Sequence, residues 1–332
     1  MSIPPKKPEE RTIDAILRPA LWEEYVGQDK VKRHLRIILD AAKKRGEVAD
    51  HLLFYGQAGL GKTTLAHLVA KELNANLKVT SGPALEKMSD LAAVLTNLED
   101  KDILFIDEVH RLNRNIEEVL YPAMESRKLH LTVGKGPGAR MLALDLPAFT
   151  LIAATTRANL LSEPLRARFG ASFKLDYYEL PEIETIVHRS AKLLNITLEE
   201  EAAKLVARAS RSTPRVANRL LKRVRDYVEV HEFPSATADV VKKTLDLLEI
   251  DELGLEPYDR QLLSTIITKF HGGPVGLQTL AAALHEDKGI IEDVYEPYLM
   301  SIGLLHRTPS GRIATEEAYA HLNLTNGKAA LI

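Results

Sequence analysis

Residues 56–63 read Gly-Gln-Ala-Gly-Leu-Gly-Lys-Thr, which fits the spacing G-x-x-x-x-G-K-[ST] of a phosphate-binding loop. An apolar run, 51–55, precedes the loop, and a helical pattern with Leu65, Leu68 and Leu73 on one face follows it. Glycines allow the N–H groups of such a loop to curl around phosphate oxygens, and the following helix adds its positive dipole end. The sequence therefore predicts a strand, a phosphate loop and a helix, and not an ordinary glycine-rich turn.

The loop also supplies the candidate nucleotide-binding residues, which are Gly59, Gly61, Lys62, Thr63 and Thr64. A lysine at this position reaches the β- and γ-phosphates of a nucleotide, and the hydroxyl of Thr63 is placed to ligate Mg²⁺. We therefore expect ATP and Mg²⁺ as the ligands of this site.

The composition limits the class of protein. The chain has 332 residues, of which 45% are hydrophobic and 27% are charged, so it is long enough for two or three domains. It contains no cysteine, which excludes disulfides and zinc–thiolate sites. No apolar run approaches the ~20 residues that span a bilayer, and the polar, proline-rich start predicts a mobile tail and not a secretion signal. We expect a cytoplasmic protein with no membrane partner; because the net charge is only −2, any DNA site must be a local patch.

Short apolar segments alternate with helical patterns between residues 51 and 176, which is typical of a parallel sheet covered on both faces. The expected strands are 51–55, 77–80, 103–106, 150–154 and 172–175. Beyond about residue 179 the periodicity is helical throughout, and the segment 251–257 has the glycine and proline of a linker. We therefore expect a flexible tail, 1–16; a nucleotide-binding domain, 17–179, with an inserted β-hairpin, 129–147; a helical domain, 180–251; and a third domain, 252–332.

The strand at 103–106 leads into two acids, Asp107 and Glu108. Open α/β sheets bind their ligands at the carboxyl ends of the strands. Asp107 is therefore expected to hold the metal through its water shell, and Glu108 to polarise the attacking water.

A second strand, at 150–154, ends in hydroxyl residues. Thr156 is a candidate for a hydrogen bond to the γ-phosphate or the water, although a threonine here also serves as a simple strand cap. Two arginines, Arg166 and Arg168, follow and lie before the next strand. They are either ordinary surface residues or include a finger that points to the γ-phosphate of a neighbouring subunit, where it is worth ~10³–10⁵ in rate. We prefer Arg168 for that role.

Arg215 stands in the first turn of a basic helix, where the helix dipole does not favour a cation. Such a charge usually has an anionic partner, and we expect this partner to be the γ-phosphate.

Two alternating segments, 129–133 and 141–146, flank a glycine-rich turn at 134–138 and predict a β-hairpin. One face of the hairpin carries only apolar side chains, namely Leu129, Leu131, Val133, Leu142, Leu144 and Leu146. This face either covers the domain core or forms a docking surface for a partner. The candidates for partner binding are Leu142, Leu144 and Leu146.

The last 80 residues predict three helices and a two-stranded wing at 304–315, which together indicate a winged helix. Arg307 and Arg312 flank the wing turn and are candidates for contacts with DNA phosphates, with little sequence preference. The alternative is a winged helix that serves only protein contacts.

Taken together, these residues resemble the AAA+ ATPases, and within that class the RuvB family of bacterial Holliday-junction motors. The resemblance covers residues 14–320, and its most specific pieces are 107–113, 154–157, 164–170, 272–277 and 307–313. It implies an α/β fold with an AAA+ P-loop parallel-sheet domain, an all-helical lid domain and a C-terminal winged-helix domain.

The resemblance also implies roles for particular residues. Leu17, Arg18 and Tyr178 are expected to border the adenine or ribose, and Arg215 to act as the second sensor. The sensor threonine and arginine finger of the family fall on Thr156 and Arg168.

As a member of this family, the chain is expected to form a homo-hexamer on double-stranded DNA and to drive branch migration of Holliday junctions in recombination, repair and the SOS response. A RuvA-like junction-binding protein is expected to dock on the hairpin, and a RuvC-like resolvase is a further expected partner.

Two other functions share this ATPase architecture. A clamp loader is disfavoured by the winged C-terminus and by the lack of zinc-binding cysteines. An ATP-dependent DNA-binding switch without rapid turnover is disfavoured because Glu108, Thr156 and Arg168 are all present.

Overall fold

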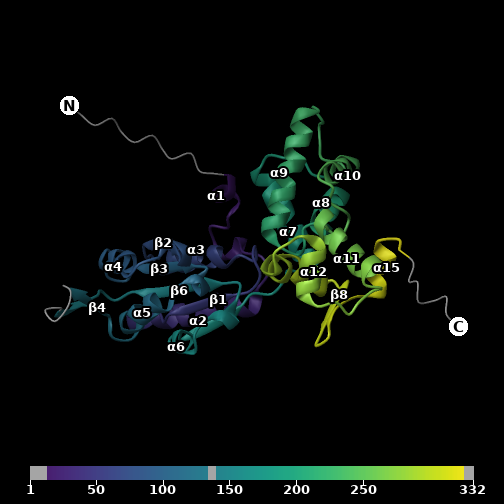
Figure 1. Cartoon of the computed structure of the whole chain (residues 1–332). Coiled ribbons are helices and arrows are strands. Elements are labelled where there is room, and N and C mark those ends of the chain that lie inside the picture. The colour runs from purple at the N-terminus through teal and green to yellow at the C-terminus, as the bar shows by residue number, and fades with distance from the viewer. Residues whose placement is uncertain (1–12, 134–139, 325–332) are drawn as a thin grey trace, which may run out of the picture. The chain divides into compact units, whose positions relative to one another are not determined.

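The structure is a computed structural model that describes residues 13–133 and 140–324 (Figure 1). The chain forms two compact units: the first extends to Glu182 and includes Thr213–Arg215, and the second contains Ile183–Ser212 and the residues from Val216 onward. Residues 1–12 of the expected tail lie outside the described part. Residues 13–16, which were expected to belong to the tail, lie in helix α1 (Ile13–Leu17).

A five-stranded parallel sheet forms the centre of the first unit, with the strand order β2-β3-β6-β1-β7. All five expected strands are present, and their ends differ from the prediction by at most one residue. The strands are β1 (Leu52–Tyr55), β2 (Leu77–Ser81), β3 (Ile103–Asp107), β6 (Thr150–Thr155) and β7 (Ala171–Lys174). This confirms the predicted fold class for the first unit.

Helices cover both faces of this sheet, as the continuous apolar runs of its strands predict. On one face, Leu104 and Ile106 of β3 join a core cluster with residues of α4 (Met88–Thr96) and α5 (Arg114–Ser126). On the other face, α3 (Lys62–Glu72) packs against β3 and β6. His34 of α2 (Asp29–Arg45) meets the ring of Phe173 in β7 edge-on.

The hairpin is formed by β4 (Lys128–Val133) and β5 (Arg140–Asp145), which pair Leu129 with Leu144 and Leu131 with Leu142. Its expected turn, 134–138, lies outside the described residues. The four paired leucines share one face, as the alternation predicts.

The second unit begins with a helical part and ends with the winged-helix part. The helical part contains α8 (Glu200–Arg208), α10 (Ala238–Leu247) and most of α7 (Leu180–Leu193) and α9 (Pro214–Val230), whose first residues belong to the first unit. The winged-helix part contains α11 (Pro257–Lys269), α12 (Leu277–Leu284), the wing strands β8 (Leu305–Thr308) and β9 (Gly311–Ala314), and α15 (Glu316–His321). Both parts agree with the predicted classes.

The third helix of the winged-helix part differs from the prediction, because it is not continuous. A π-turn, Ile291–Tyr295, separates α13 (Lys288–Ile290) from α14 (Glu296–Ser301). Pro297 stands at the start of α14. A proline has no N–H to donate and its ring clashes with the carbonyl group four residues earlier, so the backbone widens at this point.

An ion pair joins the two parts of the second unit. The guanidinium of Arg211 lies 3.1 Å and 3.3 Å from the two carboxylate oxygens of Asp259, and it stacks 4.6 Å above the ring of Tyr298. Asp259 is fully buried; its burial raises the pKa of that carboxyl, and Arg211 opposes the shift. Nearby, a Cβ atom on Gly254 would lie 2.4 Å from the carbonyl oxygen of Ala209. The linker between the two parts is therefore tightly packed.

The wing carries a second buried ion pair. Arg312 is 7% exposed, and its guanidinium lies 2.6 Å and 3.1 Å from the two carboxylate oxygens of Glu296, which is 1% exposed. Arg307 on the opposite strand pairs with Glu292 at 2.8 Å, but about half of its side chain remains exposed. The two arginines therefore have different surroundings.

These surroundings predict different costs of substitution. Arg312→Met leaves Glu296 buried without its cation, and we expect a loss of about 3–5 kcal/mol in the free energy of unfolding. Arg307→Met, the matched control, removes an exposed pair and should cost about 0–1 kcal/mol. Urea unfolding of the full chain, followed by circular dichroism, measures both values. Equal costs for the two variants would contradict this account of the wing.

Candidate functional site

The phosphate loop has the backbone conformation that its glycines predict. Gly56, Gly59 and Gly61 have φ angles of 141°, 83° and 96°, in the left-handed region that other residues avoid. A Cβ atom on Gly56 would lie 2.4 Å from the carbonyl oxygen of Leu175, and one on Gly61 would lie 2.7 Å from the hydroxyl oxygen of Tyr25. Both positions therefore need glycine for conformation and for space.

Lys62 lies at the centre of the loop and is 8% exposed. Its amine donates hydrogen bonds of 2.8 Å to the carbonyl oxygens of Gly56 and Gln57. The pKa of Lys62 is lowered to about 8, mainly by burial; the carboxylate of Asp107 opposes the shift, and the nearby Arg215 contributes to it. Since Lys62 is also the first residue of α3, where the helix dipole favours an anion, the site is suited to a phosphate group.

The two expected metal ligands lie close together. The hydroxyl of Thr63 donates to one carboxylate oxygen of Asp107 at 3.4 Å, and the other oxygen accepts the backbone N–H of Glu108 at 2.8 Å. A hydroxyl and a carboxylate are the oxygen ligands that Mg²⁺ prefers. Thr63 and Asp107 therefore fit a Mg²⁺ ion that accompanies a bound nucleotide.

Glu108, the expected catalytic base, is turned toward Arg111. Their charged groups lie 3.2 Å apart, and about half of each side chain is exposed. Such a solvated pair is worth only about 0–1 kcal/mol. The carboxylate of Glu108 is therefore held weakly and is free to turn toward a water molecule.

The two threonines at the end of β6 have different surroundings. Thr155 is 1% exposed, and its hydroxyl lies 2.9 Å from Nδ1 of His110 and accepts the backbone N–H of Arg157 at 2.9 Å. Thr155 thus closes the strand end, which is the alternative role considered for Thr156. Thr156 itself is exposed beside the strand end.

His110, Arg111 and Thr155 were missed as site residues by the sequence reasoning. Burial lowers the pKa of His110, which favours a neutral ring beside the catalytic acids. A signal was available in the sequence, because His110 and Arg111 lie within four residues of the end of β3, and Thr155 ends β6 at the same edge of the sheet.

The side chain of Arg168 is held by contacts within its own chain. Its guanidinium lies 4.4 Å above the ring of Tyr121, pairs with Glu125 at 3.0 Å and donates to the carbonyl oxygen of Pro164 at 2.6 Å. Its Nε is buried and has no hydrogen-bond partner among the described residues. No described contact brings Arg168 to the phosphate loop of its own chain.

The remaining expected nucleotide residues lie near the loop or α3. The Cβ atom of Arg215 is 3.0 Å from the position of a Cβ on Gly59. Arg18 bonds through its guanidinium to Nε2 of His67 in α3 at 2.6 Å. Leu17 and Tyr178 are both buried, at 3% and 4% exposed.

The hairpin face is divided between the core and the solvent. Leu129 and Leu146 are 0% and 8% exposed and belong to the core cluster, against which Leu131 and Leu144 also pack. Leu142 is 46% exposed. The expected docking surface is therefore smaller than the sequence suggested: Leu146 is a core residue, Leu144 is half-buried, and Leu142 is open.

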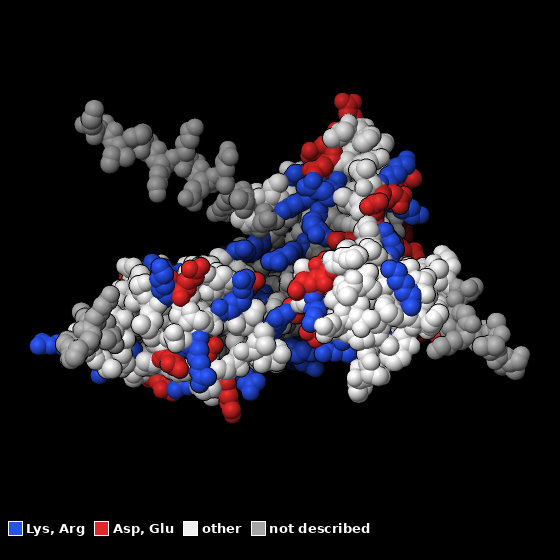
Figure 2. Space-filling model, viewed as in Figure 1, with Lys and Arg blue, Asp and Glu red and all other residues white. Residues whose placement is uncertain are grey.

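Arg312 is likewise placed differently from the expectation. Its bidentate pair with Glu296 takes up its guanidinium inside the winged-helix part, so it is not presented to a phosphate. Figure 2 shows a mainly uncharged surface on the visible face around α12 and β8. Arg307 is the exposed arginine of the two candidates.

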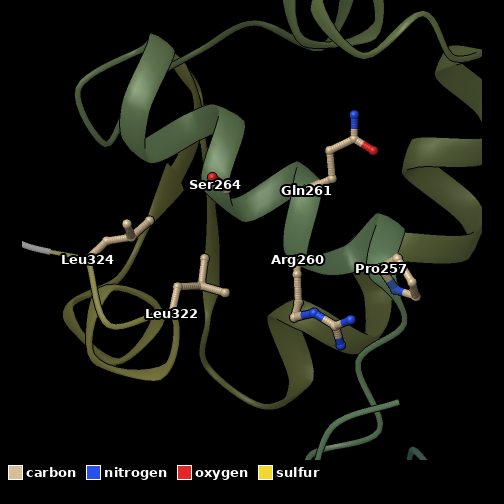
Figure 3. Close-up of a pocket in the computed structure, with 6 residues that line it drawn as sticks. All are labelled: Pro257, Arg260, Gln261, Ser264, Leu322 and Leu324. Carbon is tan, nitrogen blue, oxygen red and sulfur yellow. The ribbon is translucent and has the colours of Figure 1, made fainter. Parts of the chain in front are cut away.

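An open pocket of about 360 Å³ lies in the winged-helix part and is drawn in Figure 3. It is lined by Pro257, Arg260, Gln261, Ser264, Leu322 and Leu324. Arg260 donates to the carbonyl oxygens of Leu255 and Glu249, so its charge stabilises the linker. None of the expected nucleotide residues lines this pocket.

Comparison with known proteins identifies the family. Residues 17–175 match the Holliday junction DNA helicase RuvB P-loop domain, residues 178–251 the RuvB AAA lid domain, and residues 252–323 the RuvB C-terminal winged helix domain. The chain belongs to the RuvB family. Within the described ranges, 13–133 and 140–324, no helix combines the length and the apolar character that a membrane span requires.

Individual relatives agree with this assignment. The Holliday junction branch migration complex subunit RuvB of Dehalococcoides mccartyi is 55% identical over 316 residues, which are 95% of this chain and 90% of that protein. The solved structure of the Thermotoga maritima RuvB Holliday junction branch migration motor is 49% identical, with a TM-score of 0.86 over 93% of this chain and 99% of that one. A variant of the same protein gives a TM-score of 0.85 at the same identity, over 93% of this chain and 99% of that one. The predicted family and fold class are confirmed.

The lowered pKa of Lys62 predicts how ATP binding depends on pH. A bound triphosphate raises the pKa of this amine, so binding takes up a proton wherever the free amine is deprotonated. Above about pH 8 the dissociation constant for ATP should therefore rise, by up to about tenfold for each pH unit. Titration with a fluorescent ATP analogue between pH 7 and 9.5 measures this dependence.

Lys62→Arg is the control for that titration, because a guanidinium keeps its charge throughout this range. Its affinity should be flat over the same pH values, even if it is weaker overall. A wild-type profile as flat as that of Lys62→Arg would show that the amine keeps its proton in the free protein.

Proposed function

We propose that this chain is an ATP-driven motor that moves double-stranded DNA and drives branch migration of Holliday junctions in recombination and repair. The observation that carries the proposal is the union, in one RuvB-family chain, of a buried phosphate-loop lysine, an acidic strand end and a winged helix. The names of the relatives refer to the same activity. A clamp loader and an ATP-dependent DNA-binding switch are not favoured, because neither accounts for the winged helix together with the catalytic residues.

Each catalytic residue has a separate task in the hydrolysis of ATP. Lys62 contacts the β- and γ-phosphates, and the N–H groups of the loop hold their oxygens. A Mg²⁺ ion held by Thr63 and Asp107 would neutralise charge on the phosphates. Glu108 leaves its weak pair with Arg111, orients the attacking water and accepts its proton. Thr156, which is exposed beside the strand end, hydrogen-bonds to the γ-phosphate or to the attacking water.

The arginine finger acts between subunits of a homo-hexamer. The side chain of Arg168 contacts Glu125 and Tyr121 of its own chain, and its Nε has no hydrogen-bond partner among the described residues. A finger that does not reach its own loop is suited to the γ-phosphate of a neighbour, where a guanidinium stabilises the charge of the transition state.

Mixed assemblies test this arrangement. Arg168→Ala and Lys62→Ala subunits should each lose about 10³-fold or more in ATPase rate when alone. In an equal mixture, about a quarter of the interfaces join an intact loop to an intact finger, so part of the activity should return. Steady-state phosphate release across mixing ratios measures the recovery.

Arg166→Ala is the matched control, because Arg166 is exposed in α6 (Glu163–Arg166), two residues before the finger. It should keep the wild-type rate. A complete lack of recovery at every ratio would contradict a finger supplied by the neighbour.

We also infer how release of the γ-phosphate is coupled to movement of the DNA. Arg215, beside Gly59, is the second residue of α9, whose later residues belong to the second unit. Within that unit, the pair of Arg211 with Asp259 ties the helical part to the winged-helix part. A shift of α9 after hydrolysis is therefore passed to the winged helix, which moves with the DNA that it holds.

DNA contact at the wing rests on Arg307, which is half exposed. Arg312 supports the wing from within through Glu296. Contacts of this kind neutralise phosphates and carry no sequence information.

The hairpin is the docking surface for a RuvA-like junction-binding protein, and a RuvC-like resolvase is a further partner of the assembly. Leu142 is the exposed apolar residue at this surface, while Leu146 anchors the hairpin in the core.

ATP-dependent dissociation of a synthetic four-way junction tests the function and this surface together. The wild-type protein should dissociate the junction only with ATP, and faster when the junction-binding partner is present. Leu142→Asp should keep the DNA-free ATPase rate and lose the gain from the partner. Leu146→Asp, the control, should lower the thermal midpoint because it buries a charge in the core. An ATPase that never moves a junction, with or without the partner, would contradict the proposed function.

A further inference from the structure

Two buried tyrosines meet at the phosphate loop. Tyr25 and Tyr178 are 3% and 4% exposed. The hydroxyl of Tyr25 lies 3.4 Å from the carbonyl oxygen of Leu60, and the hydroxyl of Tyr178 lies 3.2 Å from that of Tyr25 and 3.3 Å from the same carbonyl oxygen. Oxygen atoms from three separate segments of the chain therefore converge at one point of the loop.

The carbonyl group of Leu60 needs such a partner. Leu60 is 1% exposed and precedes Gly61, the N-cap of α3, whose own carbonyl oxygen accepts the first helical hydrogen bond from Leu65 at 2.9 Å. The carbonyl of Leu60 is thus outside the hydrogen-bond ladder of α3, and a buried carbonyl without a partner is unfavourable. Each tyrosine hydroxyl has one proton to donate. Both protons are used when Tyr178 donates to Tyr25 and Tyr25 to Leu60, and also when both hydroxyls donate to the carbonyl oxygen of Leu60.

The protons stay in place over the working range of pH. Burial raises the pKa of Tyr178 to about 12, and burial raises the pKa of Tyr25 well above its ordinary value. Both hydroxyls therefore remain donors.

The segment that carries Tyr25 also contacts the entrance to the lid. The amide of Gln28 donates to the carbonyl oxygen of Asp176 at 2.7 Å and accepts the N–H of Asp176 at 3.3 Å. A Cβ atom on Gly27 would lie 2.9 Å from the ring of Tyr178 and 2.9 Å from the carboxylate of Glu182. Residues 176–182 lead from β7 into α7, the first helix of the lid. Residues 25–28 thus contact the phosphate loop at one end and the approach to the lid at the other.

We propose that Tyr25 is a positioning residue for ATP hydrolysis, which holds the phosphate loop at Leu60 and links it through Tyr178 to the segment that enters the lid. Its hydroxyl fixes the loop backbone just before Gly61, and the N–H groups that face a phosphate depend on that backbone. Because the three oxygen–oxygen distances exceed the usual 2.7–2.8 Å, the hydrogen bonds are weak. Their loss should therefore affect the geometry of the loop more than the stability of the fold.

Tyr25→Phe removes the hydroxyl and keeps the ring. We expect its dissociation constant for a non-hydrolysable ATP analogue to rise about 3- to 10-fold, with a lower kcat and a higher KM for ATP. Without nucleotide, its thermal midpoint should fall by no more than about 4 °C. The rise in midpoint that a fixed concentration of the analogue produces should be smaller than in the wild type, since this rise follows affinity.

Tyr258→Phe is the matched control. The hydroxyl of Tyr258 donates to the carbonyl oxygen of Leu284 at 3.1 Å in the winged-helix part, so the variant loses a similar bond away from the nucleotide loop. It should show a similar small fall in midpoint and an unchanged affinity, kcat and KM. The double variant Tyr25→Phe with Tyr178→Phe removes both hydroxyls that donate to Leu60, so its loss of affinity should exceed that of Tyr25→Phe alone.

The proposal is overturned if Tyr25→Phe keeps the wild-type affinity, kcat and KM, or if it changes them no more than Tyr258→Phe does. All of these measurements use the full chain without DNA, with ATP for the kinetics and the non-hydrolysable analogue for affinity. The proposal rests on the nucleotide site of the proposed motor, but its failure would leave junction dissociation unaffected, and a failure of junction dissociation would leave this test valid.

Discussion

The amine of Lys62 is buried and held by two carbonyl oxygens of its own loop, and the nucleotide end of the molecule depends on this interaction. Burial of a cation is unfavourable unless its protons are bonded, and the carbonyl oxygens of Gly56 and Gln57 provide such bonds. The closed loop requires glycine at positions 56 and 61 and places Lys62 at the start of α3. The parallel sheet then brings Asp107 and Thr156 to the same edge, since the carboxyl ends of its strands lie together.

Local patterns in the sequence predicted most of the fold and the nucleotide loop, because alternation, glycine spacing and strand-end acids act over a few residues. The failures come from contacts between distant residues. The sequence around Arg312 does not show that Glu296, which is buried in helix α14, pairs with it. Leu146 follows the same alternation as Leu142, but only the folded domain shows that it packs in the core. Which of the two threonines closes the end of β6 likewise depends on a distant residue: the hydroxyl of Thr155 bonds to His110, which follows another strand.

In the second unit, the buried ion pair of Arg211 with Asp259 joins the helical part to the winged-helix part. Asp259 is fully buried, and separating the helical part from the winged-helix part would expose Arg211 and leave that carboxylate without its cation. The loss is large for a buried pair, so the two parts resist separation more strongly than a flexible linker would allow. Free rotation at the linker would dissipate any motion that starts at α9. The buried pair at this junction therefore keeps the helical part and the winged-helix part together.

Helix α5 carries both Tyr121 and Glu125, which seat Arg168, and the hairpin strand β4 begins two residues after the helix ends. The N–H of Leu146, at the far end of the hairpin, returns to the carbonyl oxygen of Arg127 at 2.8 Å, so both arms are anchored at the same helix end. A load on β4 or β5 is thus transmitted to α5, the helix whose Tyr121 and Glu125 hold Arg168. In the proposed hexamer, the docking hairpin and the proposed arginine finger would therefore share one helix, α5.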